Sequence, residues 1–238
     1  MATVAIHQPN FFPWLGYFDK VARCDRFVFL DHVQYPKTGG NWSNRVRLLV
    51  NGRAEWVTAP IVRSFHGVRA VSEIEFAARQ PWRDKLLKTL RASYGRTPFF
   101  AETMPLLEPM VMNADDNLAR YNSKAIMQLA DHIGLRAPVW HFSSRLGVSE
   151  QSTDLLVALT KRVGADRYLC GGGAGEYQDD AAFSAAGLTL QYQHFSHPIY
   201  AQRPGDGFVA GLSIIDALMN CGRTRVGQML RGESDRGV

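Results

Sequence analysis

The chain has 238 residues, of which 46% are apolar and 21% charged, and its net charge of +5 is mild, as is typical of a globular protein with a sizeable core. No apolar run approaches the roughly 20 residues that span a bilayer, and His7–Pro9 interrupts the apolar N-terminus, so we expect neither a transmembrane helix nor a signal peptide. Three widely spaced cysteines argue against a disulfide framework or a zinc cluster and favour a cytoplasmic location.

The first 35 residues predict a strand, a turn, a helix and a second strand. Polar side chains gather where each strand ends, at His7 and Gln8 and again at Asp31, and a proline-punctuated turn precedes the helix. A parallel βαβ unit places its ligand site beyond the carboxyl ends of its strands, so we expect the functional site there. The predicted elements are a strand at Val4–Ile6, a helix at Leu15–Cys24 and a strand at Phe27–Leu30.

A hairpin and a short strand are predicted next. Residues Arg45–Val50 alternate in polarity and run into Asn51-Gly52, a two-residue turn signal of the type I′ class. Trp56–Ile61 is therefore predicted as the returning strand, and Val71–Phe76 as a further short strand.

From residue 80 apolar residues recur every three or four positions, which predicts three helices between about residues 80 and 134. Pro105 and Pro109 predict a break or a late start in the second of these helices. Asp115 and Asp116 are candidate caps for the third, which is expected to run to about His132. We interpret this block as an insertion or subdomain within a single α/β domain that spans residues 1–238.

Strands and helices then alternate again, and a glycine run from Gly171 to Gly175 follows one of the strands. The expected elements are strands at Val139–Ser143, Arg167–Cys170 and Leu188–Gln193, and helices at Glu150–Val163, Tyr177–Ala186, Leu212–Asn220 and Thr224–Leu230. Together they predict an α/β fold with a mostly parallel, Rossmann-like (nucleotidylyltransferase-like) sheet, a helical insertion and a small β-hairpin.

Three residues are candidates for acid–base catalysis. His7 ends the first strand, where such groups are often placed, although a histidine there can also serve only to hold the turn. Asp31 ends the second strand and is either a base or substrate ligand, or a turn aspartate. His197 follows the last strand and would form a base and its orienting partner with Asp31 or Asp216, if they meet in space.

Other residues supply hydrogen bonds or positive charge. Gly171 and Gly172 lie between a strand and a helix, where backbone amides can cradle an anion, but the run lacks the P-loop ending and the dinucleotide spacing. Arginines around residues 45–69 either form a solvated surface or face an anion. No His or Cys spacing supports a metal site. The predicted substrate-binding residues are Gln8, Tyr17, Gln34, Asn44, Arg45, Ser143, Gly171, Gly172, Tyr177, Tyr200, Gln202 and Asp216.

The turn before the first helix resembles the nucleotidylyltransferase superfamily, whose His-x-Gly-His signature occupies this place. In this chain Trp14 and Tyr17 stand where the two histidines would be, so the phosphate chemistry of those imidazoles is lost. The resemblance covers about 30 residues and supports the architecture more than nucleotide chemistry.

Longer motifs look like the WbqC-like family, and they extend over nearly the whole chain. The opening motif is HQPNFFPWLGYF, from His7 to Phe18. Where the family usually reads Ser-Gly after Tyr-Leu, this chain has Cys170-Gly171, which argues against a nucleophilic serine at that position. The other matching segments are Asp31–Tyr35, Asn44-Arg45, Trp56–Pro60, Tyr168–Ala174, His197–Gln202 and Leu212–Asp216.

The resemblance implies a role in surface-polysaccharide or natural-product biosynthesis, where members are proposed to attach an amino acid or acyl group to an amino sugar or another amine. We therefore expect an amide-forming acyl or aminoacyl transferase without a resident cofactor. Its acceptor would be a small amine, such as a nucleotide-linked amino sugar. Its co-substrate would be an acyl or aminoacyl thioester on a carrier protein, an aminoacyl-tRNA or ATP.

In this hypothesis His7 takes the proton from the attacking amine, and Asp31 orients the acceptor or the imidazole. Asn44, Arg45 and the amides after Cys170 hold a phosphate or the developing oxyanion. Direct transfer is favoured over a covalent intermediate, with Cys170 as the exception to consider. The alternatives are an ATP-dependent nucleotidyl or adenylyl transferase-like enzyme and a non-catalytic sugar- or carrier-binding protein.

Overall fold

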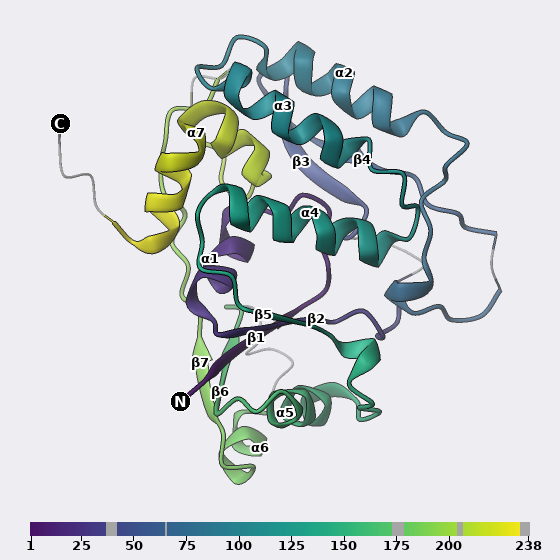
Figure 1. The fold of residues 1–238 in the computed structure, drawn as a ribbon, viewed down its shortest axis with the longest axis vertical. Coiled ribbons are helices and arrows are strands. Elements are labelled where there is room, and N and C mark those ends of the chain that lie inside the picture. The colour runs from purple at the N-terminus through teal and green to yellow at the C-terminus, as the bar shows by residue number, and fades with distance from the viewer. Residues whose placement is uncertain (37–41, 65, 173–178, 204–206, 234–238) are drawn as a thin grey trace.

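Five parallel strands form the central sheet, and helices cover both of its faces (Figure 1). The computed structural model describes residues 1–36, 42–64, 66–172, 179–203 and 207–233. In their order across the sheet the strands are β5 (Val139–Phe142), β2 (Arg26–Phe29), β1 (Thr3–His7), β6 (Arg167–Cys170) and β7 (Thr189–Tyr192).

The strand β1 occupies the centre of this sheet. The chain adds β2 and then β5 on one side of it, and later β6 and β7 on the other. If the five strands are numbered 1 to 5 as they occur in the chain, their order across the sheet is 3-2-1-4-5. This is the order of the first five strands of a Rossmann fold, and it creates a switch point between β1 and β6. The predicted α/β fold with a mostly parallel, Rossmann-like sheet is thus confirmed.

The alternation of side chains along β1 divides the interior into two cores. Val4 and Ile6 pack with residues of α5 (Ser152–Arg162) and α6 (Asp180–Ala185), below the sheet in Figure 1. Ala5 belongs to the larger core above the sheet. Burial on both faces is typical of a parallel sheet. The larger core includes residues of α1 (Leu15–Arg23), α4 (Leu118–His132) and α7 (Ile214–Arg231).

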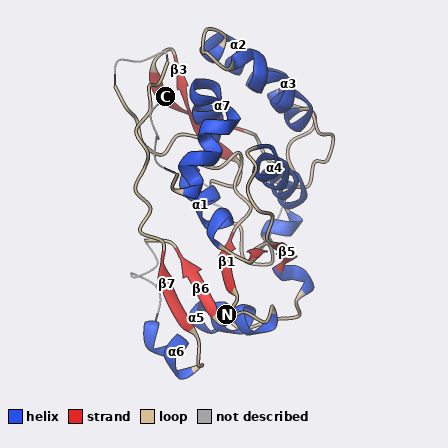
Figure 2. Ribbon diagram, turned by 60° about the vertical axis from the view of Figure 1, so that its left-hand side comes forward, coloured by secondary structure: helices blue, strands red, loops and turns tan. Residues whose placement is uncertain are grey.

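A separate antiparallel hairpin extends the larger core away from the sheet and contacts α2 (Trp82–Tyr94) and α7, and α3 (Phe100–Val111) packs against these two helices (Figure 2). Its strands are β3 (Arg45–Val50) and β4 (Arg53–Thr58). The turn residues Asn51 and Gly52 have φ angles of 50° and 76°, as the predicted type I′ turn requires. In the part of the chain that the structure describes, no helix has the length and apolar character needed to cross a membrane.

The short strand predicted at Val71–Phe76 is wrong, because the segment forms a 3₁₀ helix, η1, at Val71–Glu73. The Glu73 carboxylate accepts a hydrogen bond from the Ala70 backbone N–H at 2.8 Å, which closes the turn locally. Such a bond between side chain and backbone competes with an extended conformation. Only isolated bridges are recorded here, at Ile61–Phe76 and Glu75–Asn117 among the described residues.

The break predicted from Pro105 and Pro109 is also wrong, since α3 runs without interruption through both prolines. The two prolines are four residues apart and both are exposed. The carbonyl groups that lose their N–H partners therefore face water, which reduces the cost of the missing bonds. Buried side chains on the opposite face hold the helix against the core; they include Met104, Leu107 and Met110.

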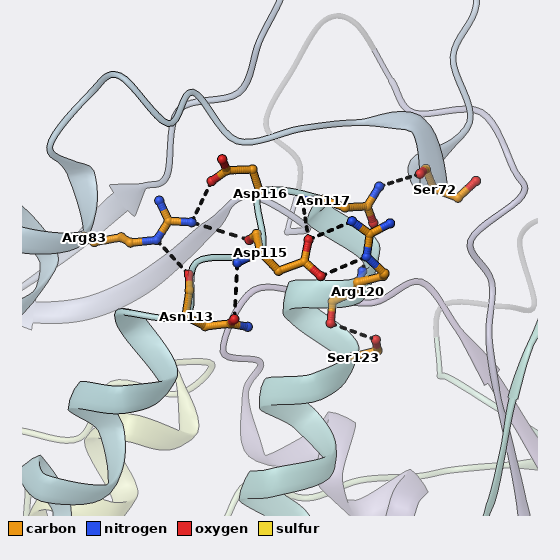
Figure 3. Close-up of polar contacts among 8 residues, drawn as sticks. All are labelled: Ser72, Arg83, Asn113, Asp115, Asp116, Asn117, Arg120 and Ser123. Atoms are coloured by element: carbon orange, nitrogen blue, oxygen red, sulfur yellow. Dashed lines mark hydrogen bonds and ion pairs between the residues drawn. The ribbon is translucent and has the colours of Figure 1, made fainter.

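The cap of α4 lies one residue beyond the predicted pair. Asn117 is the N-cap, and its side chain accepts a hydrogen bond from the Arg120 N–H at 3.0 Å (Figure 3). Asp115 instead forms a bidentate ion pair with Arg120, at 2.8 Å to each oxygen. Asp116 pairs with Arg83 at 2.8 Å, which joins the start of α4 to α2.

Candidate active site

A cavity of about 400 Å³ opens at the carboxyl ends of β1, β6 and β7, at the switch point of the sheet. Its wall combines the last residue of β1, the first turns of α1 and the segments that follow β6 and β7. This is the place that the βαβ pattern predicted for a ligand. The lining residues are His7, Trp14, Gly16, Tyr17, Lys20, Gly171, Gly172, Gln193, His194 and Phe195.

A second cavity, also of about 400 Å³, adjoins the first. His7 and Trp14 line both cavities and therefore stand between them. The remaining lining residues of the second cavity are Asn10, Trp42, Arg47 and Gly211. His7 thus borders both cavities.

The hydrogen bond of His7 fixes its tautomer. Its Nδ1 lies 3.0 Å from the backbone oxygen of Gln8. A carbonyl oxygen only accepts, so Nδ1 carries the proton and Nε2 is left as an acceptor. Burial and the nearby Lys20 ammonium lower the pKa of His7 from 6.5 to about 3. The ring is therefore neutral at physiological pH, the state required to accept a proton.

Tyr17 and Gln8 hold this imidazole in place. The Tyr17 hydroxyl donates to the backbone oxygen of Gln8 at 3.1 Å, and the Tyr17 ring lies 4.7 Å from that of His7. Both hydrogen bonds go to the backbone oxygen of Gln8, a predicted ligand residue, and not to its side chain. Burial raises the pKa of Tyr17 well above its usual value, so the hydroxyl stays protonated and able to donate.

Trp14 forms the partition between the cavities, and two residues hold it. A Cβ atom on Gly16 would lie 2.2 Å from the Trp14 indole, so only glycine allows the ring to pack there. On another side His197 stacks with Trp14, with ring centroids 5.9 Å apart. His197 Nε2 accepts a hydrogen bond from the Gly211 N–H at 3.0 Å. Among the described residues His197 has no recorded contact with Asp31 or Asp216, so the structure does not form either predicted pair.

Lys20 is a charged residue of the first cavity, and it was not among the predicted site residues. It lies on α1, is only 6% exposed and lines the first cavity. No hydrogen bond or ion pair of its ammonium is recorded among the described residues. Burial lowers the pKa of Lys20 from 10.5 to about 8, partly offset by negatively charged groups such as Asp19. The sequence does contain a signal, since Lys20 interrupts the buried stripe of Tyr17, Val21 and Cys24 on the helix.

Asp31 occupies a different environment from the one expected. It is 3% exposed, and its oxygens accept hydrogen bonds from the Ser143 hydroxyl, the Ser144 N–H and the Ser144 hydroxyl at 2.7–2.9 Å. Ser143 is itself buried and also contacts His32 Nδ1 at 2.6 Å. These bonds tie the end of β2 to the end of β5, and neither Asp31 nor Ser143 lines either cavity.

Three predicted ligand residues lie on or before the hairpin. Asn44 is buried, with its amide bonded to the Tyr35 hydroxyl at 3.0 Å and to the Ala59 carbonyl at 2.9 Å. Arg45 stacks on Trp56, 4.0 Å from the ring centroid, and Trp56 contacts Trp42 of the second cavity. Gln34 is exposed and lines neither cavity. Of the expected cationic residues, it is Arg47 rather than Arg45 that reaches a cavity next to His7.

Tyr200, Gln202 and Asp216 gather in a buried network of their own. The Tyr200 hydroxyl donates to Asp216 at 2.8 Å, and Gln202 exchanges two hydrogen bonds with the Val209 backbone. Burial raises the pKa of Asp216 from 3.8 to about 6. None of the three lines the two cavities.

Two further residues were singled out in the sequence analysis, Cys170 and Tyr177. Cys170 is 0% exposed and its thiol donates to the Gln191 carbonyl at 3.4 Å, so it is not accessible to a substrate. Tyr177 lies outside the described residues. Within the described ranges no group of three or more His, Cys, Asp or Glu side chains is arranged to hold a metal ion.

The fold and the cavities define an α/β protein with a Rossmann-like sheet and a cavity at its switch point. The sequence model of the WbqC-like protein family matches residues 8–228, and the chain belongs to this family, which confirms the predicted resemblance. The chain is also similar to the Uncharacterized protein Rv1507c of Mycobacterium tuberculosis, at 27% identity over 227 residues that cover 93% of this chain and 95% of that protein. No solved structure matches the chain significantly.

Proposed function

We propose that this protein transfers an acyl or aminoacyl group to an amine, forming an amide in surface-polysaccharide or natural-product biosynthesis. The observation that carries the proposal is a neutral imidazole, that of His7, located between two cavities. Amide formation brings an acyl donor and an amine together, and it requires a group that removes the proton of the attacking amine. The arrangement around His7 meets both requirements.

In the proposed reaction the amine nitrogen attacks the carbonyl carbon of the donor, and a new C–N bond forms. His7 Nε2 accepts the proton that the nitrogen loses. The C–S or C–O bond to the carrier then breaks, and the imidazolium returns the proton to the leaving sulfur or oxygen. His7 is thereby neutral again, and atoms and charge balance without an external oxidant or reductant.

The surroundings of His7 support this role. The hydrogen bonds of Tyr17 and His7 to the same Gln8 carbonyl fix the ring, so Nε2 does not have to reorient during the reaction. The second cavity is lined by the indoles of Trp14 and Trp42, which suit the face of a sugar or a base. It is also lined by Arg47, whose guanidinium suits an anionic group. We assign the amine acceptor, such as a nucleotide-linked amino sugar, to this aromatic cavity.

The donor is then assigned to the cavity beside Lys20 and Gly171. The candidate donors are a thioester on a carrier protein, an aminoacyl-tRNA and a carboxylate activated by ATP. A cytoplasmic location gives access to all three. Each donor provides a good leaving group, so the protein itself supplies positioning and proton transfer rather than a covalent nucleophile, in agreement with the burial of Cys170 and Ser143.

A nucleotidyl or adenylyl transferase remains the second candidate, and the Rossmann-like strand order with a lysine at the switch point favours it. However, Trp14 and Tyr17 occupy the positions of the signature histidines, and the Tyr17 hydroxyl is already bonded to Gln8. Release of pyrophosphate from ATP in the presence of a carboxylic acid, without an amine, would favour this candidate over direct transfer.

The proposal is tested by incubating the protein with amino-sugar nucleotides and with carrier-loaded, tRNA-loaded or coenzyme-linked donors, followed by mass spectrometry for an amide. We expect His7→Gln to lower product formation by at least 100-fold. His132→Gln, which changes a histidine on α4 away from both cavities, is the matched control and should retain full activity. Ligand binding without product from any donor would instead indicate a non-catalytic binding protein.

A further inference from the structure

The ammonium of Lys20 is an almost fully buried charge without a recorded ion pair among the described residues. We infer that Lys20, with the backbone of Gly171 and Gly172, forms a subsite for a phosphate group of the ligand. The subsite lies in the first cavity, and the inference rests on the proposed transfer. It specifies that the substrate bound in this cavity carries a phosphate or diphosphate.

The energetic cost of Lys20 supports a ligand role. Burial of a charged group in a protein interior is unfavourable unless a partner compensates the charge, so unpaired buried lysines are rare. Among the described residues, the carboxylate that acts on Lys20 is that of Asp19, but it is bonded to Arg23 at 3.1 Å and to Gln193 at 2.8 Å. Two cysteines also act on Lys20. Burial raises the pKa of the Cys24 thiol to about 12, so this thiol stays protonated, and the Cys170 thiol donates a hydrogen bond to the Gln191 carbonyl at 3.4 Å.

The shape of the wall beside Lys20 admits an anion close to the ammonium. An ideal Cβ atom on Gly171 would lie 3.2 Å from Lys20 Nζ, so any other residue there would occupy the space next to the charge. Gly171 comes directly after β6, and Gly172 also lines the cavity without a side chain. This is the feature that allows a phosphate to approach a backbone closely in nucleotide sites.

The helix that carries Lys20 adds a second favourable contribution. α1 begins at Leu15, its first turn contains Gly16 and Tyr17 of the cavity wall, and that turn has no acidic residue. The positive end of the helix dipole therefore lies near the same cavity. A lysine, as a compact point charge, suits the several oxygens of a phosphate without demanding the planar geometry that an arginine imposes on a carboxylate.

The test measures binding of inorganic pyrophosphate and inorganic phosphate by titration calorimetry, with succinate as a dicarboxylate control. We expect the wild type to bind pyrophosphate at least tenfold more tightly than succinate. Lys20→Met should weaken pyrophosphate binding by at least tenfold, whereas Lys20→Arg, which keeps the charge, should retain more affinity than Lys20→Met. Lys85→Met removes an exposed lysine on α2 and should leave the affinity unchanged.

Thermal unfolding separates this role from a structural one. If Lys20 holds an unpaired charge for a ligand, Lys20→Met should melt at the same or a higher temperature than the wild type, and pyrophosphate should no longer raise that temperature. The inference is overturned if Lys20→Met keeps the wild-type affinity, or if the wild type binds neither pyrophosphate nor phosphate, or prefers succinate. These measurements require no turnover. Absence of phosphate binding would therefore overturn the subsite even if amide formation is observed, and phosphate binding would support the subsite even if no amide forms.

Discussion

The pKa of His7 depends on the charge of Lys20, and at the level of single residues this dependence would link the proposed phosphate binding to the proposed catalysis. Lys20 is the second cause, after burial, that lowers the pKa of His7 to about 3. A base with so low a pKa is neutral but weak. An anion bound beside Lys20 would cancel part of that effect and raise the pKa of His7 toward the range in which a general base is effective. Binding of the proposed phosphate-bearing substrate would thus strengthen the base that acts on the amine.

Asp216 allows a prediction about stability and pH. Because its pKa in the folded protein, about 6, lies above the unfolded value of 3.8, its stabilising contribution is present below pH 3.8 and is lost as the pH rises through 6. The shift corresponds to roughly 3 kcal/mol. Asp216→Asn, which mimics the protonated group, should therefore raise the free energy of unfolding at pH 7 and flatten its dependence between pH 4 and 7, measured by urea denaturation.

The control for this prediction is Asp154→Asn, which removes an exposed carboxylate on α5 and the same net charge. It should leave the slope between pH 4 and 7 as in the wild type. If Asp216→Asn retains the wild-type slope, the buried carboxylate is already compensated by the hydroxyl groups around it, such as that of Tyr200 at 2.8 Å, and the prediction is contradicted.

At the scale of elements, the two C-terminal helices predicted from the sequence meet in α7, where Gly222 has φ 73° and ψ 165°. This conformation is open only to glycine, and a Cβ atom on Gly222 would lie 2.6 Å from the ring of Phe99. We therefore expect Gly222→Ala to destabilise the protein by roughly 2–4 kcal/mol, as the sum of backbone strain and steric overlap, measured by chemical denaturation.

Gly147→Ala is a matched comparison for this effect. Gly147 also has a positive φ, 65°, but no atom lies within 4 Å of the position of its Cβ. Gly147→Ala should therefore lower the free energy of unfolding by about 1 kcal/mol, the cost of the backbone conformation alone. Equal losses for the two variants would show that the contact between Gly222 and Phe99 contributes nothing beyond the backbone.

At the scale of the whole molecule, one hydrophobic core joins the sheet, the hairpin and the helices from 82 to 132. Side chains such as Phe11, Phe76, Trp82 and Tyr121 pack together in this core, although they come from four different segments. We therefore predict that the helical block does not unfold separately. Thermal unfolding should be a single transition in which the calorimetric and van't Hoff enthalpies agree. Two resolved transitions would show that residues 80–134 form an independent subdomain.

Much of the fold was predictable from local patterns. Short apolar segments between helical patterns located all five strands of the sheet, and the alternation of Arg45–Val50 with the Asn51-Gly52 turn located the hairpin, because these signals depend on neighbouring residues alone. The failures at Val71–Phe76 and at Pro105 have different causes: a local side-chain bond that the apolar pattern does not reveal, and packing between segments distant in sequence. In the first, Glu73 closes a turn, and in the second, packing of one helix face outweighs two missing hydrogen bonds.

The sequence by itself determined the class of fold, the family and the place of His7 at the end of the first strand, since each depends on residues that are adjacent in the chain. Only the tertiary structure decided which polar residues meet. It placed Asp31 with Ser143, placed Asp216 with Tyr200 and brought Lys20 and Gly171 to the wall of the cavity beside His7. The physical reason is that burial and partners, which set the charge and availability of each group, come from strands and helices far apart in sequence.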